Sequence, residues 1–444
     1  MSGITPSSTP PLSPALRSFE AQWRARSVDS LAPVREQAMQ RFLQLGLPSL
    51  RDESWRYTNL RRLAAQSFVD APRAPVGILP PSAAFSLTDP LDRAITVMMV
   101  NGYPLLPVDV DNDSIEIISL RELSRTDPGL LSRHLLPLSD ADEARWGLLN
   151  TALFVDGLYL KIKSQSAAPL VILHIATADE PDTMAYPRVI IDACAGSKAT
   201  IIEHHVQQGE EATLSNSATH IALKRGAELE HYRLFATGAG ASHIDSLSIG
   251  QERDSRCRQF TVALGGGLVR ASLDARLTEA NASLESFALL VGHGERHVDC
   301  VNIVRHSAPD TRSRQTARAI ASGTSRVIFN SKVVVDAGAV RAESGQSCRG
   351  LLLSPTAEID SRPQLEIHTD EVKCAHGATT GRLDPDMLFY MLSRGLDRDT
   401  AQSLLVYAFL ADVLTGMSVA SARGAIENAL IAQLPDSQVL QRFR

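Results

Sequence analysis

Short β-like segments return at nearly constant steps through the middle of the chain. Small or polar residue pairs that favour turns precede four of these segments, at Ser197-Lys198, Gly226-Ala227, Asp254-Ser255 and Asn281-Ala282. Counted from the second residue of each pair, the steps are 29, 28 and 27 residues. A repeat of this length without helices favours a β-solenoid, whose stacked coils bury one continuous core. Periodicity leaves a large β-sandwich or jelly roll open as the alternative.

The segments that follow these turns alternate apolar and polar side chains and are rich in β-branched residues, which is typical of strands. They cover residues 199–206, 229–235, 258–262 and 283–290, within a β-like region that runs from about residue 95 to residue 374. We expect six side chains of these strands to point into the core of the solenoid: Ile202, Val206, Leu229, Phe260, Leu284 and Leu289.

Helical patterns occupy both ends of the chain. Residues 15–46 carry apolar side chains among polar ones and end at Gly46, and Asp384-Pro385 is a typical helix start. A second C-terminal helix carries an apolar stripe that we expect to pack locally, at Leu404, Leu405, Ala408 and Phe409. The predicted organisation is an N-terminal helical domain over residues 1–94, with a disordered start and a Pro-rich linker at 71–81, a β-helix core over 95–380 and a C-terminal helical domain over 381–444.

Charge and composition argue against several classes of protein. The 44 Lys and Arg residues against 50 Asp and Glu residues give a net charge of −6, whereas nucleic-acid binders usually carry a basic excess. The apolar runs are too short to cross a bilayer, and the Ser/Pro-rich start has no apolar signal-peptide region. The five cysteines form no CxxC pair and no disulfide framework, which fits a reducing compartment. We expect a cytoplasmic protein that binds neither nucleic acid nor membrane.

Motifs for catalysis are missing from the sequence. It contains no GxxxxGK[ST] phosphate loop, no HExxH metal motif and no GxSxG nucleophile elbow. An intrinsic ATPase or hydrolase activity therefore has no support, and we expect the chain not to be an enzyme.

The sharpest chemical signal is Cys374-Ala375-His376. On an extended strand, residues i and i+2 face the same way, so Cys374 and His376 can share one face. A thiolate and an imidazole suit zinc, iron or an iron–sulfur species, and the neighbouring Lys373 is expected to lower the pKa of the thiol. Two ligands cannot close a metal site, so a partner chain or bound sulfur would have to complete it. The alternative is a buried cysteine beside a hydrogen-bonded histidine.

Two further groups of histidines favour a structural role. The first group is His293, His297, Cys300 and His306, and the second is the pair His204-His205, whose side chains point in opposite directions on a strand. For both groups we expect core packing or a solvated face rather than metal binding.

A longer pattern surrounds the Cys-His pair. It comprises Leu351-Leu352-Leu353-Ser354, Glu358-Ile359, Pro363-Gln364-Leu365-Glu366-Ile367, Asp370-Glu371-Val372-Lys373-Cys374, His376-Gly377-Ala378-Thr379, Gly381, Leu383-Asp384, Leu388-Phe389-Tyr390 and Ser393-Arg394-Gly395. The stretch 302–409 thereby resembles the SufB/SufD family of iron–sulfur cluster scaffold components. Upstream, the segment from Glu53 to Thr58, with Trp55, Arg56 and Tyr57, resembles the E-x-W-[KR]-Y-T segment of the SufD branch.

The resemblance implies a mainly β fold, a right-handed parallel β-helix flanked by N-terminal and C-terminal α-helical domains. It implies a non-catalytic scaffold subunit in a SufBCD complex with SufB and the ABC-type ATPase SufC. Cys374 and His376 would hold a transient iron, sulfide or iron–sulfur cluster shared with SufB, and the isolated chain would keep no stably bound cofactor. Contacts with the ATPase would come from the C-terminal helices, at Leu388, Phe389, Tyr390, Arg394 and Tyr407.

The resemblance also leaves room for FADH2 on the whole complex and for a homodimer of the isolated chain. Two alternatives stay open at this point. One is a SufB-like paralogue that acts as the cluster scaffold itself. The other is a carbohydrate-binding or lyase β-helix, although such proteins are usually secreted.

Overall fold

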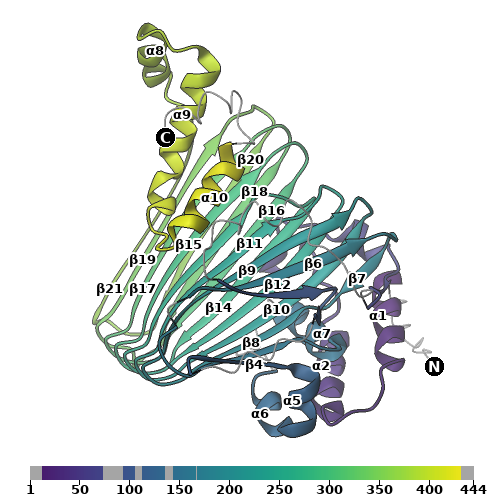
Figure 1. Cartoon of the computed structure of the whole chain (residues 1–444). Helices are drawn as coiled ribbons and strands as arrows, with labels where there is room; N and C mark the ends of the chain where they lie inside the picture. The colour runs from purple at the N-terminus through teal and green to yellow at the C-terminus, as the bar shows by residue number, and fades with distance from the viewer. Residues whose placement is uncertain (1–12, 74–93, 106–112, 136–143, 167, 432–444) are drawn as a thin grey trace, which may run out of the picture.

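The body of the protein is a parallel β-solenoid made of two long sheets that face each other (Figure 1). This computed structural model describes residues 13–73, 94–105, 113–135, 144–166 and 168–431, so the expected disordered start and most of the Pro-rich linker lie outside the described residues. The expected mainly β fold with helices at both ends is confirmed. The sandwich alternative is excluded because the strands from β8 to β21 alternate between the two sheets and pair in parallel with the next coil.

The first sheet has the strand order β20-β18-β16-β14-β12-β10-β8-β5-β4; in addition β7 pairs with β10, and β1 pairs with β7. Its strands are β1 (Val69–Asp70), β4 (Ile115–Ser119), β5 (Leu158–Ile162), β7 (Thr183–Ala185), β8 (Arg188–Ala193), β10 (Thr213–Leu223), β12 (Ser242–Gln251), β14 (Leu268–Leu277), β16 (His297–His306), β18 (Arg326–Val335) and β20 (Glu358–Ile367).

The second sheet has the order β21-β19-β17-β15-β13-β11-β9-β6-β2-β3. Its strands are β2 (Ile95–Val100), β3 (Tyr103–Pro104), β6 (Leu170–Ala178), β9 (Lys198–Gly209), β11 (Glu228–Ala236), β13 (Arg256–Ala263), β15 (Ser283–Gly292), β17 (Arg312–Ala321), β19 (Ala342–Leu352) and β21 (Val372–Arg382). The four repeated segments of the sequence are the consecutive strands β9, β11, β13 and β15 of this sheet.

The repeat has a local cause at the turns. Gly226, Asp254, Asn281 and Asp310 stand just before successive strands of the second sheet and have φ values of 69°, 60°, 64° and 60°. Glycine, aspartate and asparagine tolerate this left-handed conformation better than other residues. Each coil therefore turns at a residue suited to it, and the coils stack in register, as in the pairing of Leu229 with Cys257.

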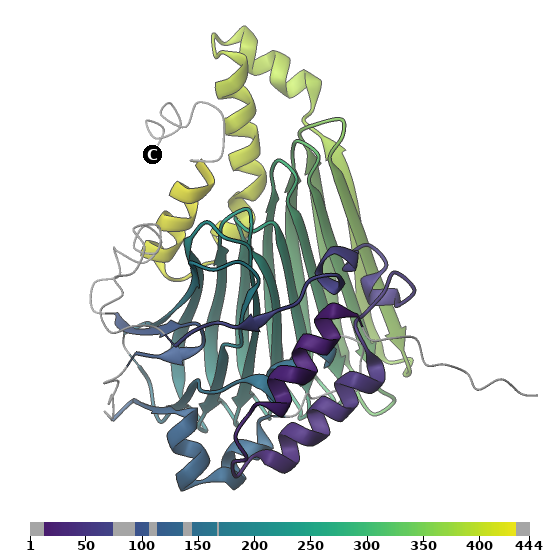
Figure 2. The same cartoon turned by 90° about the vertical axis from the view of Figure 1, so that its right-hand side faces the viewer.

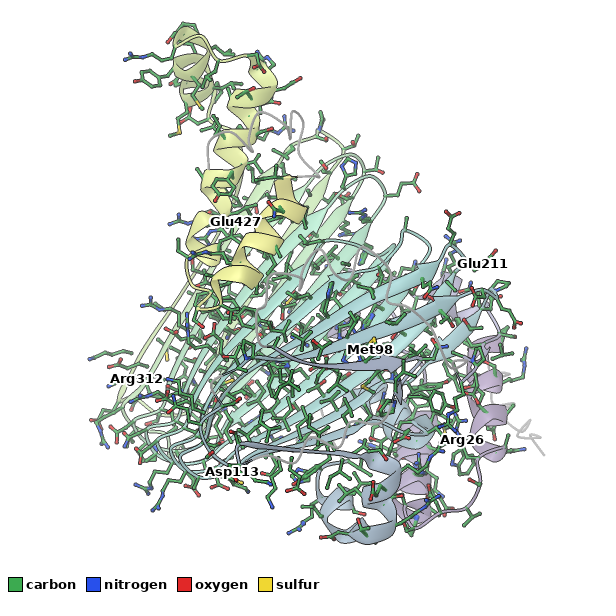
Figure 3. The ribbon with its side chains drawn as sticks, viewed as in Figure 1. Arg26, Met98, Asp113, Glu211, Arg312 and Glu427 are labelled. Carbon is green, nitrogen blue, oxygen red and sulfur yellow. The ribbon has the colours of Figure 1, made fainter. Side chains whose placement is uncertain are left out.

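Side chains fill the space between the two sheets, which we call the lumen (Figure 3). All six residues expected in the core are buried, but only Leu229 and Leu284 belong to the apolar cluster inside the lumen. Ile202, Phe260 and Leu289 lie on the other face, beneath the C-terminal helices. Val206 lies four residues after Ile202 on the same strand, so it faces the same side, and it packs in a separate small cluster. The expectation was wrong here because the second sheet is covered on both faces, so alternation does not reveal which face is inside.

Three C-terminal helices follow the last coil: α8 (Pro385–Ser393), α9 (Arg398–Leu414) and α10 (Ala420–Ile431). Helices α9 and α10 cover the outer face of the second sheet, and α8 projects beyond the strands (Figure 1). The buried positions of α9 include Ala401, Val406 and Leu410. The expected packing stripe is only partly right, because Leu404, Leu405 and Phe409 are half-buried and Ala408 is exposed, although Phe409 does pack against the apolar cluster.

The N-terminal helices are α1 (Pro14–Arg24), α2 (Ala32–Leu45), the 3-10 turn η1 (Glu53–Trp55) and α3 (Arg61–Ala64), and they pack across one face of the body (Figure 2). Three more helices lie inside the predicted β region: α5 (Leu120–Thr126), α6 (Pro128–Arg133) and α7 (Ala144–Leu153). The β-like interpretation of this stretch was wrong. Helix α7 is buried almost all round, so its sequence shows no amphipathic period. None of the described helices is long and apolar enough to cross a membrane.

Candidate functional site

The last coil of the solenoid is open. Within the described residues, β21 pairs only with β19 and β20 only with β18, so each strand keeps one edge without a strand partner. The residues of β20 and β21 are half-buried or exposed, whereas those of β16 and β18 are mostly buried. The coil therefore presents both unpaired backbone groups and the side chains that would face a core if another layer were stacked on it.

Cys374 and His376 stand on the lumen side of β21. They are in register with Ser344 and Gln346 of β19, which are buried. The side chain of Gln346 reaches across the lumen to Ser331 of the first sheet, with 2.8 Å between Nε2 and Oγ. Cys374 is half-buried against the apolar lumen cluster, and His376 is exposed. The strand thus brings the thiol and the imidazole to one open face.

The thiol of Cys374 is not activated in the isolated chain. Partial burial raises its pKa, and a hydrogen bond with the backbone of Ser344 opposes this shift. Lys373 lies on the opposite face of the strand, where its Nζ is 3.3 Å from a carboxylate oxygen of Glu343. The expectation that Lys373 lowers the pKa of the thiol was therefore wrong. Cys374 has to lose a proton before it can bind iron as a thiolate.

A row of polar side chains inside the lumen leads away from His376. The amide of Gln346 donates to Ser331, and the hydroxyl of Ser331 donates in turn to Gln315 with 2.9 Å between the oxygens. Gln259 continues the same register two coils below, where it accepts from Ser286 at 3.2 Å. Sequence reasoning missed this row. Each of several consecutive strands carries a polar residue at the same lumen position. This pattern can be recognised only once the register of the strands is known.

The residues expected to contact a partner protein lie mostly on α8. No residue of this helix is buried, and Phe389 and Tyr390 are 72% and 58% exposed. Leu388 and Phe389 line a groove of ≈ 830 Å³ between α8, α9 and the strand ends. The guanidinium of Arg394 lies 5.1 Å from the centre of the Tyr390 ring. Tyr407 instead packs in the apolar cluster between α9 and the sheet.

The first of the two other histidine groups is held by hydrogen bonds at separate places. His297 faces outward to Thr58, while His306 faces inward and is held by Thr311 and Ser313, each 2.8 Å away. His293 bonds to Ser322 at a turn. The structural role expected for this group is confirmed. His205, by contrast, belongs to a buried polar cluster in the lumen that the sequence did not reveal.

The fold and its open end define a class of protein: a β-solenoid between helical segments, whose last described coil carries a cysteine and a histidine on one open face. Comparison with known proteins gives the family. Residues 174–409, more than half of the chain, match the model described as SUF system FeS cluster assembly, SufBD core domain, and residues 16–169 match the SufBD protein N-terminal region. The chain belongs to the SufBD family, and its role lies in iron–sulfur cluster assembly.

Individual relatives agree with this assignment. The iron–sulfur cluster assembly protein SufD of Escherichia coli is 29% identical over 400 residues, which cover 89% of this chain and 90% of that protein. A SufBD family protein of Synechocystis is 28% identical over 87% of each chain. SufD of Bacillus subtilis is 23% identical over 63% of this chain and 64% of its own length. The resemblance of the chain to SufD is thereby confirmed.

Proposed function

We propose that this chain is a non-catalytic scaffold subunit of a cytoplasmic SufBCD complex and forms the nascent-cluster site together with SufB. The observation that carries the proposal is the open last coil, in which Cys374 and His376 stand on the lumen face of a strand whose outer edge has no strand partner within the described chain. A soft and a borderline ligand at an uncovered edge suit the assembly of iron and sulfide between two chains.

The partner at this edge is SufB in our proposal. An unpaired parallel strand can accept another strand, and an open solenoid end needs a cap to bury its apolar side chains. Leu365 and Val372 are partly buried side chains that such a cap would cover. A second solenoid docked here would also supply the ligands that Cys374 and His376 lack. The isolated chain should therefore hold little iron.

The two ligands have different weights in this proposal. His376 is exposed on the lumen face and is ready to bind an arriving iron ion. The raised pKa of Cys374 and its contact with the apolar cluster favour a packed, protonated thiol. We therefore assign His376 to the cluster and give Cys374 a smaller part.

The ATPase SufC binds the C-terminal helices in this proposal. Apolar side chains that project into water over a whole helix are typical of a surface covered by a partner. On α8 these are Met387, Phe389 and Tyr390, which are 56%, 72% and 58% exposed. FADH2, where it takes part, belongs to the whole complex rather than to this chain.

The test is co-expression of the tagged chain with SufB and SufC homologues under anaerobic conditions. We expect the chain to capture both partners and the three-subunit complex to contain iron and sulfide, while the chain purified without partners contains little of either. Failure to capture either partner would contradict the complex. A cluster retained by the isolated chain would contradict the shared site.

A further inference from the structure

A second group of metal-binding side chains lies deep in the lumen, far down the solenoid from the open coil. It consists of His174 on β6, Glu203 and His205 on β9, and His243 and Asp245 on β12. Each of these residues is at most 4% exposed. They come from both sheets and meet between them, so the lumen here is lined by polar groups.

The five residues form two overlapping triads. Donor atoms of His174, Glu203 and His205 all lie within 4.8 Å of one another, and those of His205, His243 and Asp245 do the same. Each triad has two imidazoles and one carboxylate, a ligand set that suits divalent first-row transition metals. His205 belongs to both triads.

His205 is a buried side chain whose position the hydrogen bonds of the core do not explain. Within the described residues His204, on the opposite face of β9, is also unpartnered, but it belongs to no group of metal-ligating side chains. His205 is 2% exposed, yet neither ring nitrogen has a hydrogen-bond partner among the described residues. Its ring stacks on those of His174 and Phe235, with centroids 4.2 and 5.0 Å away, and meets His243 edge-on at 4.6 Å. Burying an imidazole without a partner is costly, so its position points to a missing ligand.

A small cavity adjoins these rings. It measures ≈ 10 Å³ and is lined by His174, His205 and His243 together with residues of neighbouring strands, among them Met99 and Ser215. That volume holds about one water-sized sphere. The space therefore suits a single ion or a single water, but no larger molecule.

The two carboxylates of the cluster differ in their partners. The carboxylate of Asp245 is neutralised by Arg233, which is fully buried beside it. Within the described residues Glu203 pairs with no Arg or Lys; its partners are His174 at 2.9 Å, His231 at 2.8 Å and the hydroxyl of Thr219, which donates at 2.8 Å. Glu203 is therefore the carboxylate of the cluster that is open to a cation.

We propose that this end of the lumen binds one divalent first-row transition metal ion through His174, Glu203 and His205. Glu203 is chosen over Asp245 because Arg233 already neutralises Asp245. The His174 and His205 rings are nearly parallel, with 9° between their planes, so the His205 ring turns out of its stack when the ion binds. The ion links side chains of β6 and β9 and stabilises the fold. This site is separate from the proposed cluster site at the open coil.

The test uses the full-length chain with the double substitution Cys374→Ala/His376→Ala, which removes the candidate ligands of the open coil. Metal is stripped with a chelator during unfolding, the chain is refolded anaerobically, and Co²⁺ is titrated while its visible absorption is followed. We expect saturation at about one ion per chain and a higher unfolding temperature with Co²⁺ or Zn²⁺. A refolded chain that binds neither Co²⁺ nor Zn²⁺ overturns the proposal. This outcome needs no substitution in the lumen.

Lumen variants then assign the ligands. His205→Gln and Glu203→Gln keep the side-chain size and should each lower Co²⁺ affinity at least tenfold, whereas His293→Ala, at an exposed turn, should leave it unchanged. Asp245→Asn should retain the ion. Loss of the ion in Asp245→Asn together with its retention in Glu203→Gln would overturn the assigned triad. Because the open-coil ligands are absent throughout, the outcome does not depend on whether the proposed function is right.

Discussion

The guanidinium of Arg270 lies 3.6 Å from the centre of the Trp55 ring. Arg270 is on β14, and its side chain also pairs with Asp299 of β16 and donates to the carbonyl of Ser54 at 3.0 Å. Thr58 donates to the same Asp299. The segment from Glu53 to Thr58, which marks the SufD branch in the sequence, thus fastens the N-terminal helices to the outer face of the solenoid.

Arg270→Ala should destabilise the protein by about 3–5 kcal/mol, because it leaves the carboxylate of Asp299 buried without its partner. Both side chains are only 1% exposed. Unfolding in urea measures the change. Arg256→Ala is the matched control, since Arg256 pairs with Glu228 at the surface and is 71% exposed, and it should cost at most about 1 kcal/mol. An equal loss of unfolding free energy in the two variants would contradict a stabilising role for the buried Arg270–Asp299 pair.

Phe389→Asp on α8 should abolish binding of SufC without changing the stability of the chain, because the side chain is 72% exposed and packs little in the isolated protein. Pull-down measures binding and thermal unfolding measures stability. Val28→Asp is a matched control, because Val28 is 91% exposed at the other end of the molecule. Undiminished capture of SufC by Phe389→Asp would place the docking surface elsewhere. Deleting residues 384–444 is a poorer test, since α9 and α10 cover an apolar sheet face.

Stability should fall as the pH drops from about 6.5 towards about 4, partly because of His306. Burial lowers its pKa to about 4, while Asp336 opposes the shift. The unfolded chain binds a proton to this histidine near pH 6.5, whereas the folded chain does not until about pH 4, so acid favours unfolding. His306→Gln should reduce the slope by up to about 1.4 kcal/mol per pH unit within this window. Urea unfolding at several pH values measures the slope, and an unchanged slope in the variant would contradict the assignment.

Labelling of the native chain with a thiol reagent should reach Cys194 and Cys374 but not the three buried cysteines, Cys257, Cys300 and Cys348. Burial raises the pKa of Cys257 and Cys300 to about 12, which suppresses their reactive thiolates further. Binding of SufB should protect Cys374 and leave Cys194 reactive. Mass spectrometry of labelled peptides measures both sites. Protection of neither, or of both equally, would contradict docking of SufB on the open coil.

The solenoid could be predicted from the sequence because its turns recur at residues that tolerate positive φ, such as Gly226, Asp254 and Asn281. Two features escaped prediction for physical reasons. Helix α7 is buried on nearly every side and shows no amphipathic period. The second sheet is covered on both faces, so the alternation of apolar and polar residues could not show which face is inside. Phe260 faces the C-terminal helices rather than the lumen.

Of the two groups of candidate ligands, one could be predicted from the sequence and the other could not. The pair Cys374 and His376 is local, so strand geometry alone places both side chains on one face. The lumen cluster is not local, because His174, Glu203 and His243 lie in three strands and meet only through the register of the coils. The lumen cluster and its unpartnered His205 could therefore be recognised only in the folded chain.

The central claim, that His376 helps to build the cluster with SufB, is tested most directly by the cluster content of the purified three-subunit complex. Iron and sulfide per complex are measured anaerobically for the wild type, His376→Ala and His368→Ala, the last being an exposed histidine just before β21. We predict intact complexes in all three cases, a cluster content several-fold lower in His376→Ala and wild-type content in His368→Ala. A His376→Ala complex that assembles clusters at the wild-type rate would contradict the account.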